Sequence, residues 1–136
     1  MNMKMEKVIV EVSQDGLFAA YMPNDEYNFG LAGYGDSEQE AIDDFYITVE
    51  EMKELEKENG RVFPDLSFEF EYDKESLLKY YSSLIGVNTL HKMTGIPKSR
   101  LNQYILDETK PTKKSLQKIQ DGIRKFDESL NRVALM

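Results

Sequence analysis

The sequence predicts an α+β protein in which a β-β-β-α-β domain precedes an all-α domain. Hydrophobic residues alternate with period two in segments 4–12 and 66–72, and they recur at steps of three and four elsewhere, as in half-buried strands and amphipathic helices. Charge changes sign along the chain: residues 1–72 carry 5 basic and 18 acidic side chains, whereas residues 73–136 carry 12 basic and 7 acidic ones. We therefore predict a boundary at residues 73–75, between domains at 1–72 and 76–136.

The composition favours a soluble, cytoplasmic protein. Of the 136 residues, 40% are hydrophobic and none is cysteine, so disulfides and thiolate chemistry are not expected. No apolar run approaches the roughly 20 residues that span a bilayer. The segment from Met1 to Lys7 is charged and lacks the apolar stretch of a signal peptide. We expect no membrane partner.

Three short strands are predicted first. The first places Val8, Val10 and Val12 on one face. Asp15-Gly16 then has the composition of a hairpin turn, and Pro23 ends the second strand because proline cannot donate to a ladder. The predicted strands are 4–12, 17–22 and 29–34.

A long helix and a fourth strand complete this domain. Ser37 with Glu40 forms a capping-box pattern at the start of the helix, and Asn59-Gly60 is typical of its end. One face of the helix is apolar, and the residues expected to face the sheet are Ile42, Phe45, Val49, Met52 and Leu55. Segment 66–72 is the predicted fourth strand.

The second domain has helical periodicity throughout. A first helix is expected to stop near Gly86, and Asn88 can cap a short second one. The third helix is predicted from about Pro97 to Leu106, and Thr112 can cap the last. The expected inward residues are Leu77, Leu78, Tyr81, Leu84, Leu90, Met93, Leu101, Tyr104 and Ile105.

Gly95-Ile96-Pro97 predicts a helix-turn-helix, with the third helix projecting outward. Arginine, asparagine and glutamine are the side chains that read base edges, and the predicted base-contacting residues are Lys98, Ser99, Arg100, Asn102 and Gln103. The predicted phosphate contacts are Thr89, Lys92, Lys110, Thr112, Lys113 and Lys114. The expected partner is double-stranded operator DNA. The alternative is a helical bundle whose charged face is only solvated.

The last helix carries a regular apolar seam. Its members alternate steps of three and four, and they are Leu116, Ile119, Ile123, Phe126, Leu130 and Val133. A short helix-turn-helix core can cover only the first half of this seam. We therefore predict a homodimer contact through Phe126, Leu130 and Val133, and leave open whether dimers pair into tetramers. The alternative is that these residues pack on the chain's own N-terminal domain.

Two segments carry a family resemblance. LHKMTGIPKSRLNQYILDETKPTKKSLQKIQDGI (Leu90–Ile123) resembles the lambda-repressor-like helix-turn-helix at the C-terminus of many HicB-type antitoxins. Asp15–Asn24 and Gly33–Ile42 resemble the HicB domain, a partial ribonuclease-H-like β-β-β-α-β fold without the nuclease active site. Where the family pattern has a glycine before its Lys-Pro loop, this chain has Asp107 or Glu108.

The resemblance implies a type II antitoxin of a toxin-antitoxin system. Its first domain would neutralise a small HicA-like ribonuclease toxin, and its second would repress transcription of its own operon. The acidic first domain agrees with a basic partner. After the second strand, where the family commonly has a Pro-x-Leu-Pro-Gly loop, this chain instead has residues 23–29. The predicted partner-binding residues lie in this loop and are Asp25, Glu26, Tyr27 and Phe29. An alternative is a stand-alone transcriptional regulator without a toxin.

We expect no enzyme activity, no catalytic residue, no cofactor and no metal site. Glu40, Asp43 and Asp44 could hold a cation in a nuclease, but no other ligand set accompanies them, so a solvated acidic face is the better interpretation. His91 has no nucleophile or metal ligand near it in the sequence, which favours a structural histidine.

Overall fold

The computed structural model describes residues 3–134, with side chains described as far as residue 129. Its residue contacts divide the chain into two compact units, Met1–Asp73 and Lys74–Met136. The first unit contains the strands and one helix, and the second is entirely helical. The predicted α+β class is therefore confirmed.

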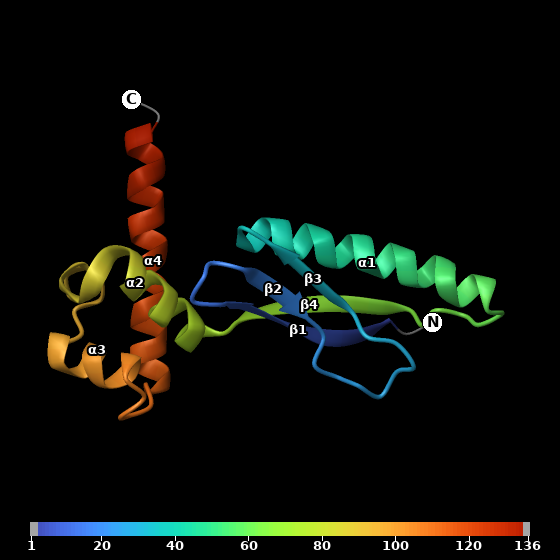
Figure 1. The fold of residues 1–136 in the computed structure, drawn as a ribbon, viewed down its shortest axis with the longest axis horizontal. Helices are drawn as coiled ribbons and strands as arrows, with labels where there is room; N and C mark the ends of the chain where they lie inside the picture. Colours follow the sequence, from blue (N-terminus) through green and yellow to red (C-terminus); the bar gives the residue numbers. More distant parts are fainter. Residues whose placement is uncertain (1–2, 135–136) are drawn as a thin grey trace. The chain divides into compact units, whose positions relative to one another are not determined.

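The first unit is a mixed sheet with a helix along one face (Figure 1). The strands are β1 (Lys4–Val12), β2 (Phe18–Tyr21), β3 (Ala32–Gly35) and β4 (Leu66–Tyr72), in the order β3-β2-β1-β4. β2 pairs antiparallel with β1 and β3. β1 and β4 run parallel, and a parallel pair needs a long crossover connection. The helix α1 (Glu38–Glu58) provides it.

The third strand begins later than the sequence predicts. Residues 29–31 were expected in it, but β3 begins at Ala32. The ring of Phe29 stacks between those of Tyr27 and Phe63, with centroid separations of 5.2 and 5.0 Å. This stacking draws residues 23–30 away from the sheet, which Leu31 rejoins by accepting a hydrogen bond from the Met22 amide at 3.0 Å.

Helix α1 begins and buries its apolar face as predicted, apart from its last turn. Ser37 Oγ accepts a hydrogen bond from the Glu40 amide at 3.1 Å, and Phe45 and Val49 are buried. The prediction for Leu55 is wrong, because 47% of this residue is exposed. The inward position there belongs to Glu56, which is 3% exposed.

Gly33 sets how closely α1 approaches the sheet. A Cβ atom placed on Gly33 would lie 2.1 Å from the backbone nitrogen of Phe45 and 2.5 Å from the carbonyl oxygen of Ala41. The helix backbone therefore lies directly against β3, with no room for a side chain. The exposed Gly30, by contrast, has no atom within 4 Å of such a Cβ position.

The second unit contains α2 (Lys74–Thr94), α3 (Lys98–Ile105) and α4 (Lys113–Ala134). The predicted break near Gly86 is confirmed, since Gly86 has non-helical dihedral angles of φ 82° and ψ 161° that divide α2. The three helices bury one core, formed by Leu78, Leu90, Ile96, Leu101, Tyr104 and Ile119.

Leu84 does not join this core, contrary to prediction, and is 59% exposed. The helix breaks two residues later, and Ile85 and Val87 pack against the core from either side of the break. Gly122 marks the contact between α2 and α4, because a Cβ atom there would lie 2.8 Å from the Met93 carbonyl oxygen.

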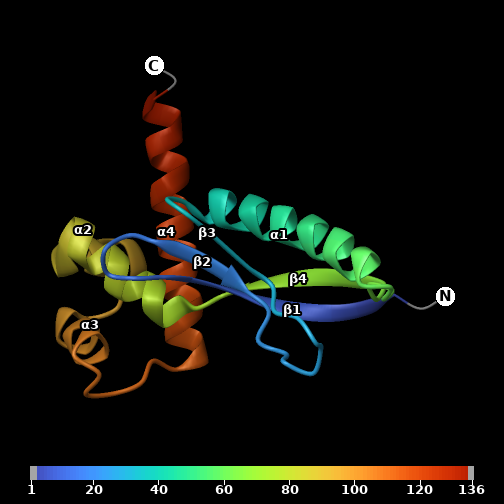
Figure 2. The ribbon, with the colours of Figure 1, turned by 45° about the vertical axis from the view of Figure 1, so that its right-hand side comes forward.

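Helix α4 continues beyond α2 and α3, as both ribbon views show (Figures 1 and 2). Ile119 is buried, Ile123 packs partly against the core, and Phe126 is half-buried. The side chains of Leu130 and Val133 lie outside the described residues. The predicted dimer contact therefore stays a prediction.

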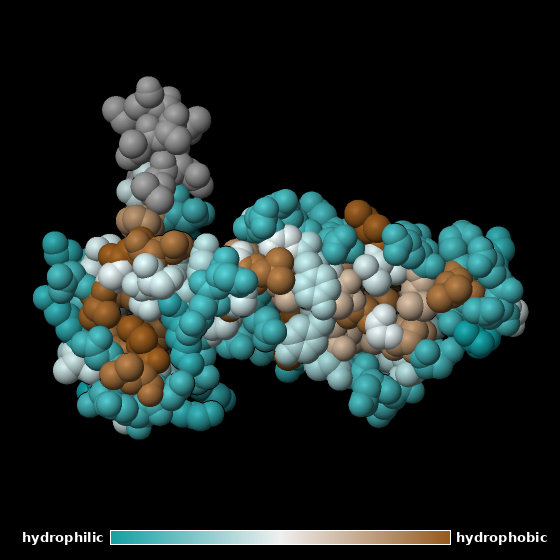
Figure 3. Space-filling model, in the orientation of Figure 1, coloured by the Kyte–Doolittle hydropathy of each residue, from teal (hydrophilic) through white to brown (hydrophobic). Residues whose placement is uncertain are grey.

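On the face drawn in Figure 3, hydrophilic side chains cover most of α1, whereas hydrophobic ones gather between α2 and α3. Exposed hydrophobic residues within the α1 sequence include Tyr46, Ile47 and Leu55. Among the described helices, none combines the length and the apolar character needed to cross a membrane.

Candidate functional site

Helix α3 presents a row of polar side chains to solvent. Its buried residues are Leu101 and Tyr104, at 0% and 5% exposure. These two anchors fix the rotation of the helix, so the intervening residues point outward. All five predicted base-contacting residues are exposed: Lys98, Ser99, Arg100, Asn102 and Gln103. The surface thus combines cations with two amides, and no described acidic residue lies within α3 itself.

The turn before α3 is held by a compact set of hydrogen bonds. Gly95 has φ 75°, in the left-handed region that favours glycine, and its amide bonds to the His91 carbonyl at 2.8 Å. His91 Nδ1 donates to the Ile96 carbonyl at 2.7 Å. Thr94 Oγ1 accepts from the Ile96 amide at 3.1 Å. These bonds give His91 a structural role and fix the position at which α3 begins.

The far end of α3 is attached to α4 through hydroxyl groups. Tyr104 Oη and Ser115 Oγ lie 3.1 Å apart in the buried interior. The Ser115 amide donates to Thr112 Oγ1 at 3.1 Å, which confirms Thr112 as the predicted cap of α4. The Thr112 hydroxyl also donates to Ser115 Oγ at 3.2 Å, so its single O–H donor is already used within the protein.

The predicted phosphate-contacting cations are all accessible. Each of Lys92, Lys110, Lys113 and Lys114 is exposed, whereas Thr89 is half-buried. Lys113 and Lys114 occupy the first turn of α4, directly after the Thr112 cap. Cations around an outward-facing helix can hold a phosphate backbone while that helix meets the bases.

In the first unit, the β2–β3 loop is tied to a buried carboxylate. Glu6 is 5% exposed, and its two oxygens accept from Asn24 Nδ2 at 3.2 and 3.0 Å. Tyr27 donates its hydroxyl to Glu6 at 3.0 Å, and Lys4 Nζ lies 3.5 Å away. The hydrogen bond from Asn24 is the main cause that holds the pKa of Glu6 below its ordinary value.

A second buried carboxylate holds the other end of this loop. Glu56 accepts two hydrogen bonds from the Arg61 guanidinium, at 2.9 Å from Nε and 3.1 Å from Nη2. Asn28 Nδ2 lies 3.4 Å from Glu56 Oε1. The hydrogen bonds from Arg61 lower the pKa of Glu56 most, and partial desolvation opposes them.

These anchors separate the four predicted partner-binding residues into two groups. Asp25 and Glu26 are exposed at the tip of the loop, whereas Tyr27 and Phe29 are half-buried in the aromatic stack. The structural role of Glu6 was not predicted from the sequence. Its register could have revealed it, because Glu6 shares the inward face of β1 with Val8.

We expect acidification to weaken the fold through Glu56. Its folded-state pKa lies below the ordinary value of 4.5, so its ionised form stabilises the fold above that pH, and this contribution is lost as the pH falls through the folded-state value. Urea unfolding of Glu56→Gln should show a lower midpoint than wild type at pH 7 and a smaller further loss on acidification.

Glu58→Gln is the matched control, because Glu58 is an exposed residue on the same helix. It should unfold like the wild type at neutral pH. Equal midpoints for Glu56→Gln and the wild type at pH 7 would contradict the anchoring role of the Glu56 carboxylate.

The acidic residues at the start of α1 have local partners. Asp44 Oδ2 accepts from the Tyr34 amide at 2.8 Å, which joins α1 to the edge strand β3. Asp43 Oδ1 accepts from Gln39 Nε2 at 2.8 Å. Within the described part of the chain, no group of three or more acidic, histidine or cysteine side chains is placed to hold a metal ion.

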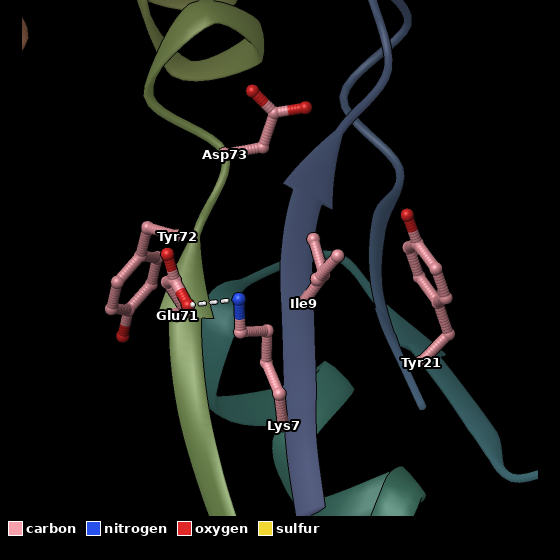
Figure 4. A pocket seen from close by; sticks show the side chains of 6 residues that line it. All are labelled: Lys7, Ile9, Tyr21, Glu71, Tyr72 and Asp73. Carbon is pink, nitrogen blue, oxygen red and sulfur yellow. Dashed lines mark ion pairs between the residues drawn. The ribbon is translucent and has the colours of Figure 1, made fainter. Parts of the chain in front are cut away.

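The sheet face opposite α1 carries a shallow hollow of about 200 Å³. Figure 4 shows its lining residues, which are Lys7, Ile9, Tyr21, Glu71, Tyr72 and Asp73. Among these lining residues, Lys7 Nζ and Glu71 Oε2 form an exposed ion pair of 3.1 Å.

No protein-family model, curated protein or solved structure matches this chain.

Proposed function

We propose that this protein is a type II antitoxin of the HicB kind, which represses its own operon and neutralises a HicA-like ribonuclease toxin. The second unit is the DNA-binding part and acts as a homodimer. The first unit is the toxin-binding part. The observation that carries the proposal is the row of polar side chains on α3, which faces solvent because Leu101 and Tyr104 are buried.

Side-chain chemistry supports double-stranded DNA as the ligand. Arg100 can donate two hydrogen bonds to guanine, and Asn102 or Gln103 can pair with adenine. The flanking Lys110 and Lys113 supply the sequence-independent attraction to phosphate. Base readout needs a helix that is held firmly in place. The hydrogen bonds of His91 and Tyr104, at the two ends of α3, support such a placement.

Charge and rigidity support a basic protein as the partner of the first unit. Residues 1–72 carry 18 acidic side chains against 5 basic ones, so a basic partner would be steered towards them. Asp25 and Glu26 lie between Asn24, which donates a hydrogen bond to Glu6, and Asn28, which lies within hydrogen-bonding distance of Glu56. A loop already held in place loses little conformational entropy on binding.

The DNA-binding half is tested with a fluorescent duplex from upstream of the gene and a scrambled duplex, each at two salt concentrations. Wild type should prefer its own duplex. Arg100→Ala should weaken binding to that duplex by about 1–3 kcal/mol and relax its base preference. Lys113→Ala should weaken binding to both duplexes about equally and reduce the salt dependence.

Lys57→Ala is the control for loss of charge, because Lys57 is an exposed cation on α1, in the first unit. It should bind both duplexes as the wild type does. If Arg100→Ala and Lys113→Ala also bind like the wild type, α3 and α4 do not form the DNA surface.

The rival is a stand-alone regulator without a toxin. A short basic reading frame beside the gene separates the two, because toxin and antitoxin are normally encoded together. If its product arrests growth and co-expression of this chain restores it, the antitoxin proposal stands. If no such reading frame exists and the chain still binds its upstream duplex, the stand-alone regulator is the correct function.

A further inference from the structure

An acidic residue occupies the turn at the end of α3, where the backbone would suit glycine. Asp107 has φ 59° and is the one non-glycine residue with positive φ in the part of the chain that the structure describes. The Glu108 amide bonds to the Gln103 carbonyl at 2.8 Å, and the Asp107 amide to the Tyr104 carbonyl at 3.2 Å. This is a Schellman ending, in which the left-handed position is usually glycine or asparagine.

Aspartate is unfavourable at this position for two reasons, of which one concerns its Cβ atom and the other its charge. A left-handed conformation is disfavoured for a residue with a Cβ atom, although aspartate and asparagine tolerate it best. The C-terminal end of a helix also carries partial negative charge, which repels an anion. Glycine or asparagine would satisfy the turn without adding charge. The carboxylate of Asp107 is therefore not explained by the backbone alone.

Lys79 provides the compensating contact. Its Nζ lies 2.9 Å from Asp107 Oδ2, across 28 positions of sequence, from the first part of α2. The Lys79 side chain is 31% exposed and that of Asp107 is 72% exposed, so solvent and salt reach the pair. An exposed pair of this kind contributes little to stability. It does set the net charge at the C-terminal end of α3, because the ammonium group of Lys79 offsets the carboxylate of Asp107.

We infer that the Lys79–Asp107 pair sets the strength of phosphate attraction at the DNA-binding surface, with Asp107 limiting it and Lys79 cancelling Asp107. This inference rests on the proposed DNA-binding function and adds to it a determinant outside the base-contacting row. The loop that begins at Asp107 leads to Lys110 and the cap of α4. A carboxylate there lies close in sequence to the candidate phosphate contacts, and its repulsion acts on every DNA sequence alike.

Four variants test the inference by changing the charge of the pair in steps. Asp107→Asn removes the negative charge but keeps a residue that tolerates the turn. It should bind both the upstream and the scrambled duplex roughly threefold to tenfold more tightly than wild type, with a steeper salt dependence. Lys79→Met leaves the carboxylate uncancelled and should weaken both by a similar factor. The double variant, Lys79→Met with Asp107→Asn, restores the net charge and should bind both duplexes within about twofold of wild type.

Asp107→Gly separates charge from backbone, because glycine also suits the turn and lacks the carboxylate. It should bind like Asp107→Asn. In all four variants, the ratio of the affinity for the upstream duplex to the affinity for the scrambled duplex should stay constant. Urea unfolding of each variant checks that the second unit remains folded.

The outcomes distinguish this inference from the function on which it rests. Wild type that binds neither duplex would overturn both. Wild type that prefers its own duplex, with all four variants unchanged in affinity and salt dependence, would overturn only the role of the pair. A change confined to the specific duplex would also overturn it, since Asp107 would then act on base readout.

Discussion

Gly33→Ala is expected to lower the free energy of unfolding by about 3 kcal/mol, because overpacking a close contact between backbones leaves no flexible side chain to move aside. The new methyl group would lie 2.1 Å from the Phe45 nitrogen and 2.6 Å from its Cα. Helix α1 would have to move away from β3, and the buried Phe45 and Val49 would lose contacts with the sheet. Urea unfolding followed by far-ultraviolet circular dichroism measures the loss.

Gly30→Ala is the matched control for this experiment. It makes the same chemical change three residues earlier, at an exposed position with no atom within 4 Å of the new methyl group. Its unfolding midpoint should be unchanged or slightly raised, because alanine reduces the freedom of the unfolded chain. If both variants unfold like the wild type, the close contact of α1 with β3 does not exist.

Leu101→Ala should destabilise the second unit by about 2–5 kcal/mol, the usual cost of truncating a buried leucine. Leu101 is fully buried, and it lies between the outward residues Arg100 and Asn102. Its loss removes the anchor that fixes the rotation of α3, so affinity for the upstream duplex should fall together with stability. Urea unfolding and duplex titration on the same preparation measure both effects.

Leu106→Ala serves as the control, because Leu106 directly follows α3 and is 67% exposed. The same truncation there leaves no cavity, and it should change the stability of the unit by less than about 0.5 kcal/mol. Equal destabilisation by the two truncations would mean that α3 does not pack through the Leu101 face.

Local signals in the sequence predict most of the elements correctly. Ser37 caps α1 through its hydroxyl, Thr112 caps α4, and Gly86 breaks α2. Each of these depends on chemistry within a few residues, which a linear pattern contains. The core positions of α3 also follow from local spacing, because a helix buries residues three and four apart.

The structure differs from the sequence-based predictions where a partner distant in the sequence determines the position of a residue. Leu55 and Glu56 are neighbours, and hydropathy assigns the inward position to the leucine. The structure assigns it to the glutamate, because Arg61 and Asn28 satisfy its carboxylate. The late start of β3 has a similar cause, since the ring of Phe29 stacks on that of Phe63 rather than extending the strand.

The sequence by itself determined the order of strands and helices along the chain, the caps of α1 and α4, and the division of charge between the two halves. Each of these depends on residue type and short spacing. Only the tertiary structure revealed the two buried glutamates that hold the β2–β3 loop and the pairing of Lys79 with Asp107. Of the two acidic candidates for the glycine position, it is Asp107 that adopts the left-handed conformation. The physical reason is that a charged group is placed by its partner, and folding brings that partner from a distant part of the chain.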